Sequence, residues 1–391
     1  MTVFPGAALG SPAMTEDAAA DGDTRDPGPR RLLGPGPSNV HPQVLGAMAQ
    51  PLLGHLDPEF LAILDGVQSS LRNLFGTDNR FTLPLSATGS AGMEACLVNL
   101  LEAGDRIVIG INGVFGGRMA DVARRAGAEV IAVEAPWGLP LDESAMAAAI
   151  ESARPKVVAF VHAETSTGVR QDPEAIARTA REAGALVVLD CVTSLAGIPV
   201  ELDRWGIDAA YSGTQKCLSC PPGLSPVSFS PRALEAVTNR GTPVQSWYLD
   251  VGLLDGYYGG ERVYHHTAPI SAIYGLAAGL ARVSDEGMEK RVARHRAAAE
   301  YLVESLEPLG FSPLVSAEHR LPMLTTLQLP KTVCERGEAA VRSALLQRHA
   351  IEVGGGLGEL AGRVWRIGLM GENATHESVD TLRSALENEL A

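Results

Sequence analysis

The sequence predicts an α/β protein that has a large domain with a mostly parallel sheet and a smaller α/β domain after it. The first observation is that short runs rich in Val and Ile alternate with longer Ala-rich segments over most of the chain. The second is that these short runs are apolar throughout, as in strands of a parallel sheet that helices cover on both faces. The third is length, because 391 residues exceed the size of about 250–300 residues at which a single core usually stops growing. We therefore expect domains over residues 31–286 and 287–391.

The large domain contains the clearest strand and helix patterns. Its predicted strands are the apolar runs at 106–112, 129–135, 156–164, 186–192 and 208–213. Its predicted helices lie between strands, at 116–128 and 172–185. Parallel sheets of this kind bind ligands at the carboxyl ends of their strands, so we expect the functional residues at that edge.

The chain after residue 286 has a different texture and predicts the smaller domain. A long charged helix is expected first, over 287–310. It is followed by a predicted strand at 325–330, a helix at 337–350 and a strand at 364–370.

Composition and the N-terminal segment indicate where the protein works. Residues 1–30 are rich in Ala, Gly, Asp and Pro and lack the basic and apolar segments of a secretory signal, so we expect a disordered tail. No apolar stretch of about 18 residues could span a bilayer, and no membrane partner is expected. The five cysteines are an odd number spread over a long chain, which is not a disulfide framework. A reducing, cytoplasmic location is therefore expected.

Charge and cysteine spacing argue against two further classes of protein. The formal net charge is −14 and the Lys and Arg residues form no run, whereas nucleic-acid binding needs clustered cations. We expect no nucleic-acid partner and favour small-molecule substrates. Cys217 and Cys220 form a C-x-x-C pair, but no second pair of ligands has zinc-site spacing, so no metal is expected.

The segment Thr88-Gly89-Ser90 directly precedes an apolar-periodic helix. A helix N-terminus presents unpaired amides and the positive end of the helix dipole, and small residues let a ligand approach the backbone. This segment is therefore a candidate cradle for an anion such as phosphate. Ordinary N-capping by Thr88 or Ser90 is the alternative interpretation.

Two ionisable residues lie where a charge is costly. Asp190 ends an apolar strand, and a carboxylate buried there costs free energy unless a cation pairs with it. A structural or capping role is the alternative for Asp190. Lys216 lies in YSGTQKCLSCPPG, an uncharged stretch that indicates desolvation and a lowered pKa. A neutral lysine amine is a nucleophile, and an ordinary exposed lysine is the alternative.

These three features together match the requirements of one cofactor, pyridoxal 5′-phosphate. The cradle would bind the phosphate, and the carboxylate would keep the ring nitrogen protonated. The lysine amine, near the end of a neighbouring strand, would form the Schiff base. The sequence therefore predicts a pyridoxal phosphate site.

The chain resembles the class V aminotransferases, in particular the alanine–glyoxylate and serine–glyoxylate (serine–pyruvate) group. The matching segments cover roughly residues 31–391 in the family's order and include GPGPSNVHPQVL, ATGSAGMEACLVNLLEAGD, HAETSTGV, VLDCVTSLAG, SGTQKCLSCPPG, YHHT and RIGLMG. The resemblance implies the fold type I of pyridoxal-phosphate-dependent transferases, with a mostly parallel sheet of the seven-stranded type.

The resemblance also implies a role for each site residue. Lys216 would carry the internal aldimine and move the proton between the substrate Cα and the cofactor C4′, and Asp190 would hold the pyridine nitrogen protonated. The other cofactor contacts would be the phosphate ligands Thr88, Gly89, Ser90 and Gln215, the ring neighbours Phe115 and Val192, and Thr165 near the ring hydroxyl. Arg366 would bind the substrate α-carboxylate, and Asn39 and His55 would border the pocket. The alternatives are a salt-bridge role for Arg366 and capping roles for Asn39 and His55.

Tyr264 and Thr267 of the YHHT segment resemble the pair that this family sends to the phosphate of the other subunit. The resemblance therefore implies a homodimer with active sites at the subunit interface. An aromatic core or loop segment is the alternative. Ser90 departs from family members that have a larger side chain, such as His, at this place, which weakens any transfer of donor preference.

The implied reaction is ping-pong transamination, in which alanine or serine gives its nitrogen to the cofactor and glyoxylate or pyruvate takes it up. A specialised biosynthetic aminotransferase and a cysteine desulfurase or lyase are alternatives on the same fold. A desulfurase needs a mobile nucleophilic cysteine in its C-terminal half, where Cys334 is the one available. A non-catalytic protein that kept the fold is the remaining alternative.

Overall fold

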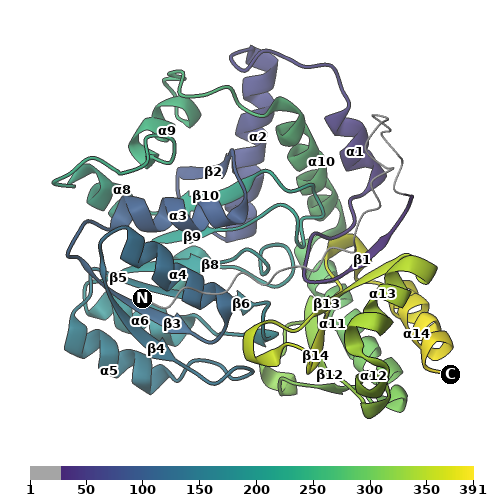
Figure 1. Cartoon of the computed structure of the whole chain (residues 1–391). Helices are drawn as coiled ribbons and strands as arrows, with labels where there is room; N and C mark the ends of the chain where they lie inside the picture. Colours follow the sequence, from purple (N-terminus) through teal and green to yellow (C-terminus); the bar gives the residue numbers. More distant parts are fainter. Residues whose placement is uncertain (1–27) are drawn as a thin grey trace, which may run out of the picture. The chain divides into compact units, whose positions relative to one another are not determined.

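The computed structural model describes residues 28–391. The predicted tail therefore lies outside the described residues except for residues 28–30, which belong to no helix or strand. Residues 31–391 form one unit that contains two large sheets and the helices that cover them (Figure 1).

The larger sheet has seven strands in the order β2-β10-β9-β8-β5-β3-β4. These strands are β2 (Phe81–Leu85), β3 (Arg106–Ile111), β4 (Glu129–Glu134), β5 (Val157–Val161), β8 (Leu186–Asp190), β9 (Ala209–Tyr211) and β10 (Ser225–Phe229). The strands from β9 to β4 run parallel, whereas β10 is antiparallel to both β9 and β2. Every residue of β5 and β8 is buried, which explains why these strands lack a polar face. The predicted mostly parallel sheet is confirmed.

Helices cover both faces of this sheet. The chain adds strands first in one direction along the sheet and then in the other, and each connection between parallel strands is right-handed. Helices from the two directions therefore lie on opposite faces. The pair α3 (Gly89–Leu100) and α4 (Val114–Arg125) packs together, and so does the pair α5 (Glu143–Ala153) and α6 (Glu174–Glu182) (Figure 1). The first turns of α3 and α4 lie at the carboxyl edge of the strands, where the sequence predicts the functional residues.

The second sheet has five strands in the order β1-β13-β14-β12-β11. These strands are β1 (Arg31–Leu33), β11 (Ser312–Pro313), β12 (Leu324–Gln328), β13 (Ile351–Gly355) and β14 (Val364–Gly368). The helices of this region are α11 (Met288–Leu306), α12 (Lys331–Arg336), α13 (Glu338–His349) and α14 (His376–Leu390). β1 pairs in parallel with β13, so the first described strand joins the sheet of the C-terminal region. The boundary at residue 286 stays a prediction.

Several further elements do not belong to these two sheets. The helices α1 (Pro42–Met48) and α2 (Pro58–Phe75) both pack against α10 (Ile270–Glu286). The shorter elements are α7 (Leu202–Trp205), α8 (Pro231–Thr238), α9 (Val251–Tyr258) and the hairpin strands β6 (Ala163–Glu164) and β7 (Val169–Arg170). Within residues 28–391, no helix has both the length and the apolar character needed to cross a bilayer.

Each sheet has its own apolar core. The larger core surrounds the seven-stranded sheet and includes the fully buried rings of Phe160, Tyr211 and Phe229. The smaller core surrounds the second sheet and includes Leu302 and Trp365. Two cores are consistent with the length argument made from the sequence.

Candidate active site

A pocket of about 150 Å³ lies at the carboxyl edge of the seven-stranded sheet. All the predicted cofactor residues except Tyr264 and Thr267 line it: Thr88, Gly89, Ser90, Phe115, Thr165, Asp190, Val192, Gln215 and Lys216. They come from the N-termini of α3 and α4, from the turn after β6, and from the ends of β8 and β9 or the loops that follow. The fold therefore brings together residues that are up to 128 positions apart, from Thr88 to Lys216.

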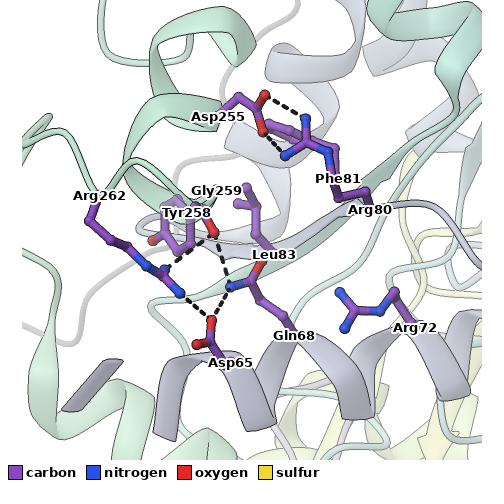
Figure 2. Close-up of a pocket in the computed structure, with 11 residues that line it drawn as sticks. Asp65, Gln68, Arg72, Arg80, Phe81, Leu83, Asp255, Tyr258, Gly259 and Arg262 are labelled. Atoms are coloured by element: carbon purple, nitrogen blue, oxygen red, sulfur yellow. Dashed lines mark hydrogen bonds and ion pairs between the residues drawn. The ribbon is translucent and has the colours of Figure 1, made fainter. Parts of the chain in front are cut away.

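A second pocket, of about 250 Å³, lies between α2, the start of β2 and the end of α9 (Figure 2). Four of its five charged side chains form two ion pairs: Arg80 donates to both oxygens of Asp255 at 2.8 and 2.6 Å, and Arg262 pairs with Asp65, while Arg72 is the fifth. Because these ion pairs neutralise much of the local charge, the smaller pocket is the better candidate for chemistry.

Asp190 has a buried carboxylate at the end of β8. Its Oδ1 atom accepts a hydrogen bond from the Val192 amide at 2.8 Å, and its Oδ2 atom accepts one from the Tyr211 hydroxyl at 2.7 Å. Burial raises the pKa of Asp190 to about 6, although these hydrogen bonds lower it. A cation placed against this carboxylate would restore its charged form.

Lys216 lies in the loop after β9, on the same edge of the sheet. Burial lowers the pKa of its amine to about 8. The Nζ atom donates to the carbonyl of Pro35. The next residue, Gly36, has φ +105°, and a Cβ atom there would lie 2.5 Å from Nζ. The absence of a side chain at Gly36 therefore leaves room for the lysine.

The cradle predicted at Thr88-Gly89-Ser90 forms the first turn of α3. Thr88 is the N-cap residue, yet its side chain makes no capping hydrogen bond. A Cβ atom on Gly89 would lie 3.1 Å from the Val192 side chain and 3.3 Å from the Ser212 carbonyl, so the backbone approaches this loop closely. The Oε1 atom of Gln215 is buried and has no hydrogen-bond partner among the described residues. Polar groups at this end of the pocket are thus available to a ligand.

Arg366 on β14 links the second sheet to the pocket. Its side chain is 7% exposed; Nε donates to the Gly355 carbonyl at 2.8 Å and Nη1 donates to the Thr165 carbonyl at 3.3 Å. Burial lowers the pKa of Arg366 to about 10, so the guanidinium stays charged at neutral pH. Thr165 itself lines the pocket, which places this fixed positive charge beside it.

Known proteins are similar to this chain over nearly its whole length. Residues 32–382 match the family model for aminotransferase class V. The alanine–glyoxylate aminotransferase of Drosophila melanogaster is 41% identical over 362 residues, which cover 91% of each chain. The (S)-ureidoglycine–glyoxylate transaminase of Bacillus subtilis is 35% identical over 376 residues, covering 92% of this chain and 90% of the relative. The solved structure of alanine–glyoxylate aminotransferase from Nostoc sp. has a TM-score of 0.92 and 48% identity, covering 97% of this chain and all of that one.

This chain is a class V aminotransferase. Its fold is the type I fold of pyridoxal-phosphate-dependent transferases, and its cofactor is pyridoxal phosphate. The predictions of family, fold and cofactor made from the sequence are confirmed.

The residues of this class V aminotransferase fit the cofactor. The buried Asp190 carboxylate, whose pKa is raised by burial, is suited to a protonated ring nitrogen. The Gln215 side chain has a buried oxygen without a hydrogen-bond partner among the described residues, and the Thr88 side chain makes no capping hydrogen bond. Both side chains are therefore available to a phosphate group. Lys216, with its pKa lowered to about 8, is suited to an aldehyde.

The pocket of the aminotransferase also contains residues that the sequence did not reveal. Arg118 on α4 lies over the Phe115 ring, 5.1 Å from its centroid, and donates to the Ser90 hydroxyl at 3.4 Å. Tyr211, at the end of β9, donates to Asp190. A usable signal existed for Arg118, because a helix places residues three apart on one face. Met93, Ala163 and Thr193 complete the lining and carried no comparable signal.

Glu164 is a further missed residue, and it fixes one wall of the pocket. Its carboxylate is fully buried and accepts hydrogen bonds from the Phe115 amide at 3.0 Å and from the Ser166 amide and hydroxyl at 3.0 and 2.6 Å. The N-cap residue of α4, Gly113, has no side chain, so Glu164 satisfies the amides at this helix end. Phe115 is thereby held in place.

Five predicted residues are not part of the pocket lining of this chain, namely Arg366, which contacts Thr165 of the lining, and Asn39, His55, Tyr264 and Thr267. The Asn39 side chain accepts a hydrogen bond from the Leu32 amide at 2.8 Å. The His55 and Tyr264 rings lie 5.3 Å apart, and the Tyr264 hydroxyl lies 3.5 Å from the Thr267 hydroxyl. The predicted border positions of Asn39 and His55 are not seen in the lining of the described pocket.

Cysteines do not take part in the pocket. Cys217 and Cys220 are buried free thiols, and Cys334 is exposed on α12. In the described part of the chain, no group of three or more His, Cys, Asp or Glu side chains is arranged to hold a metal ion.

Proposed function

We propose that this enzyme transfers the amino group of a small L-amino acid, alanine or serine, to glyoxylate or pyruvate. The observation that carries this proposal is the convergence of Lys216 and Asp190 on one small pocket, with the charged Arg366 bonded to the carbonyl of Thr165 in the pocket lining. The relatives support glyoxylate as the acceptor, since both alanine–glyoxylate and ureidoglycine–glyoxylate enzymes resemble this chain over nine-tenths of its length.

The roles of the residues follow from their positions. Pyridoxal phosphate supplies an aldehyde that accepts the amino nitrogen and a ring that withdraws electrons from the substrate. The Asp190 carboxylate holds the proton on the ring nitrogen, and the Phe115 and Val192 side chains flank the ring. The Lys216 amine, whose pKa burial lowers to about 8, would take the proton from the substrate Cα and deliver it to the cofactor carbon C4′. The Arg366 guanidinium binds the substrate α-carboxylate.

We also propose that the working form is a homodimer. Tyr264 is 58% exposed and Thr267 is exposed, and neither residue lines the pocket of its own chain. Large apolar side chains near them in sequence are exposed as well, namely Trp247, Leu253 and Val263. A second copy would cover this surface and receive Tyr264 and Thr267 at its phosphate cradle. The five free cysteines support a cytoplasmic location, since oxidising compartments favour disulfides.

The first test concerns Lys216. Borohydride reduction of the holoenzyme followed by peptide mapping is expected to place a pyridoxyl label on Lys216, and Lys216→Ala is expected to lose essentially all transamination. The matched control is Lys156→Ala. Lys156 does not line the pocket, and its Nζ atom lies 2.6 Å from a carboxylate oxygen of Asp105. A label elsewhere, or near-normal rates in Lys216→Ala, would contradict the proposal.

The second test concerns the substrates. Purified enzyme should be assayed with alanine and serine against glyoxylate and pyruvate, and single-turnover spectra should show each half reaction separately. Ureidoglycine and cysteine belong in the same panel. Preferred turnover of ureidoglycine, or release of sulfide from cysteine, would replace the proposed donor.

A further inference from the structure

We propose that Arg291 is a positioning residue for catalysis, which fixes the loop of Lys216 and the loop that follows Asp190 in one arrangement. The inference rests on the proposed roles of Lys216 and Asp190. Arg291 lies on α11, outside the seven-stranded sheet, and it does not line the catalytic pocket.

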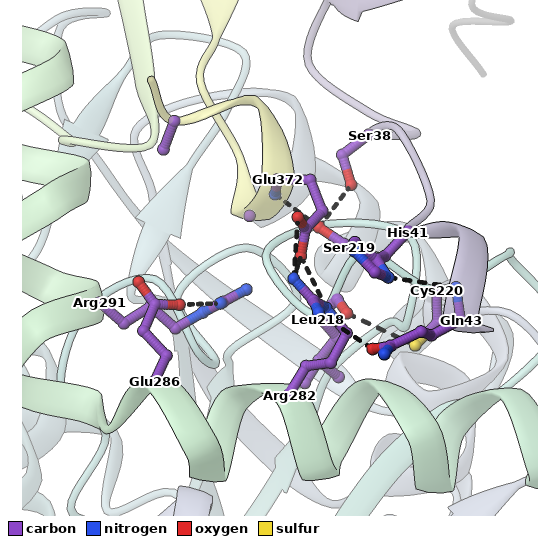
Figure 3. Close-up of polar contacts among 12 residues, drawn as sticks. Ser38, His41, Gln43, Leu218, Ser219, Cys220, Arg282, Glu286, Arg291 and Glu372 are labelled. Atoms are coloured by element: carbon purple, nitrogen blue, oxygen red, sulfur yellow. Dashed lines mark hydrogen bonds and ion pairs between the residues drawn. The ribbon is translucent and has the colours of Figure 1, made fainter. Parts of the chain in front are cut away.

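The Arg291 side chain is 2% exposed, and each nitrogen of its guanidinium has a partner. Nε donates to the Ala196 carbonyl at 3.0 Å, Nη2 donates to the Cys217 carbonyl, and Nη1 donates to a Glu286 oxygen at 2.6 Å. Figure 3 shows Arg291 and Glu286 beside the loop that carries Leu218 and Ser219. A rigid planar fork of donors can bind two carbonyls and a carboxylate at once, which a lysine cannot.

The two carbonyls belong to the two catalytic loops. Cys217 directly follows Lys216, and Ala196 lies in the middle of the loop between β8, which ends at Asp190, and α7, which begins at Leu202. Other hydrogen bonds join these segments: Cys217 Sγ donates to the Thr193 carbonyl at 3.3 Å, and the Ser212 hydroxyl donates to the Cys191 carbonyl at 2.9 Å. Arg291 therefore reinforces an existing junction from a helix of the C-terminal region.

Both loops contain a backbone conformation that needs external support. Ala196 has φ +63° and Ser219 has φ +51°, in the left-handed region that residues with a Cβ rarely adopt. Such conformations persist where the surroundings overdetermine them. Arg291 binds the carbonyl of Ala196 itself and that of Cys217, two residues before Ser219. Without the fork, we expect both loops to relax.

Further contacts hold the Lys216 loop from other parts of the chain. The Ser38 hydroxyl donates to the Lys216 carbonyl at 2.7 Å, and the Ser219 hydroxyl accepts from the Glu372 amide at 3.0 Å (Figure 3). These contacts reach only the lysine loop. Arg291 differs because its single side chain binds both loops.

Arg294 provides a matched comparison on the same helix. It also pairs with Glu286, at 2.6 and 3.0 Å, and it donates to the carbonyls of Gly371 and Ala374 at 2.8 and 3.0 Å. Arg294 thus stabilises the same C-terminal region and uses the same carboxylate, but its hydrogen bonds do not reach either catalytic loop. A purely structural role would make the two arginines equivalent.

The test compares Arg291→Met with Arg294→Met in the holoenzyme. Three quantities are measured: Tm, the midpoint of the pH titration of the bound cofactor's visible absorbance, and kcat with KM for the amino donor. We expect Arg291→Met to move the titration midpoint by about half a pH unit or more. We also expect it to lower kcat by about 10- to 100-fold, as small misplacements of catalytic groups do. Arg294→Met is expected to lower Tm while leaving the midpoint and kcat near wild type.

Arg291→Lys keeps the charge but loses the fork, and is expected to shift the midpoint in the same direction as Arg291→Met by a smaller amount. If Arg291→Met does not fold, the titration midpoint and kcat of Arg291→Lys test the inference instead. An unchanged midpoint and kcat in the folded variant, or equal changes in the Arg291 and Arg294 variants, would overturn the inference. A wild-type enzyme without a lysine-linked cofactor would instead overturn the proposed function, so the two failures are distinguishable.

Discussion

The Asp190 side chain is costly to the protein until a cation lies against it. Its carboxylate has two hydrogen-bond donors, the Val192 amide and the Tyr211 hydroxyl, but burial still raises its pKa from 3.8 to about 6. The raised pKa means that the folded protein binds this proton more tightly than the unfolded chain does. The associated stabilisation is complete below about pH 3.8 and is lost as the pH rises through about 6.

We therefore expect opposite effects of Asp190→Asn on stability and on activity. Above pH 6 the cofactor-free variant should be more stable than the cofactor-free wild type, by up to about 3 kcal/mol, because it no longer buries a charge. An amide can still accept from Val192 and donate to Tyr211. Transamination should fall by several orders of magnitude, because the ring nitrogen loses its counter-charge.

Denaturation of the cofactor-free proteins over a pH series measures the first effect. The difference in free energy of unfolding between variant and wild type should grow as the pH rises from about 4 to 6. These limits are the pKa of Asp190 in the unfolded chain and in the folded protein. Asp121→Asn, on the exposed surface of α4, is the control. A difference that does not vary with pH would contradict the assignment of Asp190 as a buried, destabilised carboxylate.

Single residues could be predicted from the sequence where their immediate neighbours define them. Lys216 in an uncharged loop and Asp190 at the end of an apolar strand both carry a local signal of desolvation. Tyr211, Glu164 and Arg291 carry no such signal. Their roles depend on partners 21 to 95 positions away in the sequence, which only the folded chain brings close.

At the scale of elements, the first turn of α4 builds one wall of the pocket. Glu164 anchors this turn through the Phe115 amide, and Phe115 and Arg118 lie on the same helix face because they are three residues apart. The predicted phosphate ligands Thr88, Ser90 and Gln215 are all uncharged, whereas a phosphate monoester carries nearly two negative charges at neutral pH. Arg118, at 3.4 Å from the Ser90 hydroxyl, is the cation at that end of the described pocket.

We expect Arg118→Gln to weaken the binding of pyridoxal phosphate by roughly tenfold, with a smaller loss at high salt, because the arginine is exposed and its charge is screened. Equilibrium dialysis of the cofactor-free protein measures this dissociation constant directly. Arg124→Gln, on the same helix but outside the pocket, is the matched control. Equal affinities for the two variants would exclude Arg118 from the phosphate site.

Elements could be predicted where periodicity is strong, and were missed where pairing is not local. The strands in the parallel part of the large sheet and the helices α4 and α6 have clear apolar patterns. The antiparallel β10 was not predicted, since its segment SPVSF contains a proline and polar residues that the pairing with β2 and β9 buries. β13 was missed because GG at its end weakens a strand pattern.

At the scale of the whole molecule, Tyr264 and Thr267 are exposed and do not line the chain's own pocket. In the proposed homodimer each active site would combine Lys216 of one subunit with Tyr264 of the other. A closed two-fold arrangement makes both active sites equivalent, so replacing either residue in both subunits impairs both sites.

This arrangement predicts complementation between two defective variants. Lys216→Ala and Tyr264→Ala homodimers should each be strongly impaired. After the two are unfolded together and refolded, half of the dimers are mixed and one site of each mixed dimer has both native residues. We expect recovery of about a quarter of the wild-type activity on this statistical basis. The absence of recovery in verified mixed dimers would show that Tyr264 serves its own subunit.

The pairing of β1 with β13 has a consequence for synthesis of the chain. Residues 31–33 are translated early, yet their partner strand begins at Ile351, so they can pair only after more than 300 further residues have been translated. The lysine loop depends on late segments in the same way, through Arg291 and the Glu372 amide. A nascent chain that has already formed its seven-stranded sheet therefore still lacks a finished catalytic centre. We expect the active site to be complete only after the segments from Ile351 onward have packed against β1 and the lysine loop.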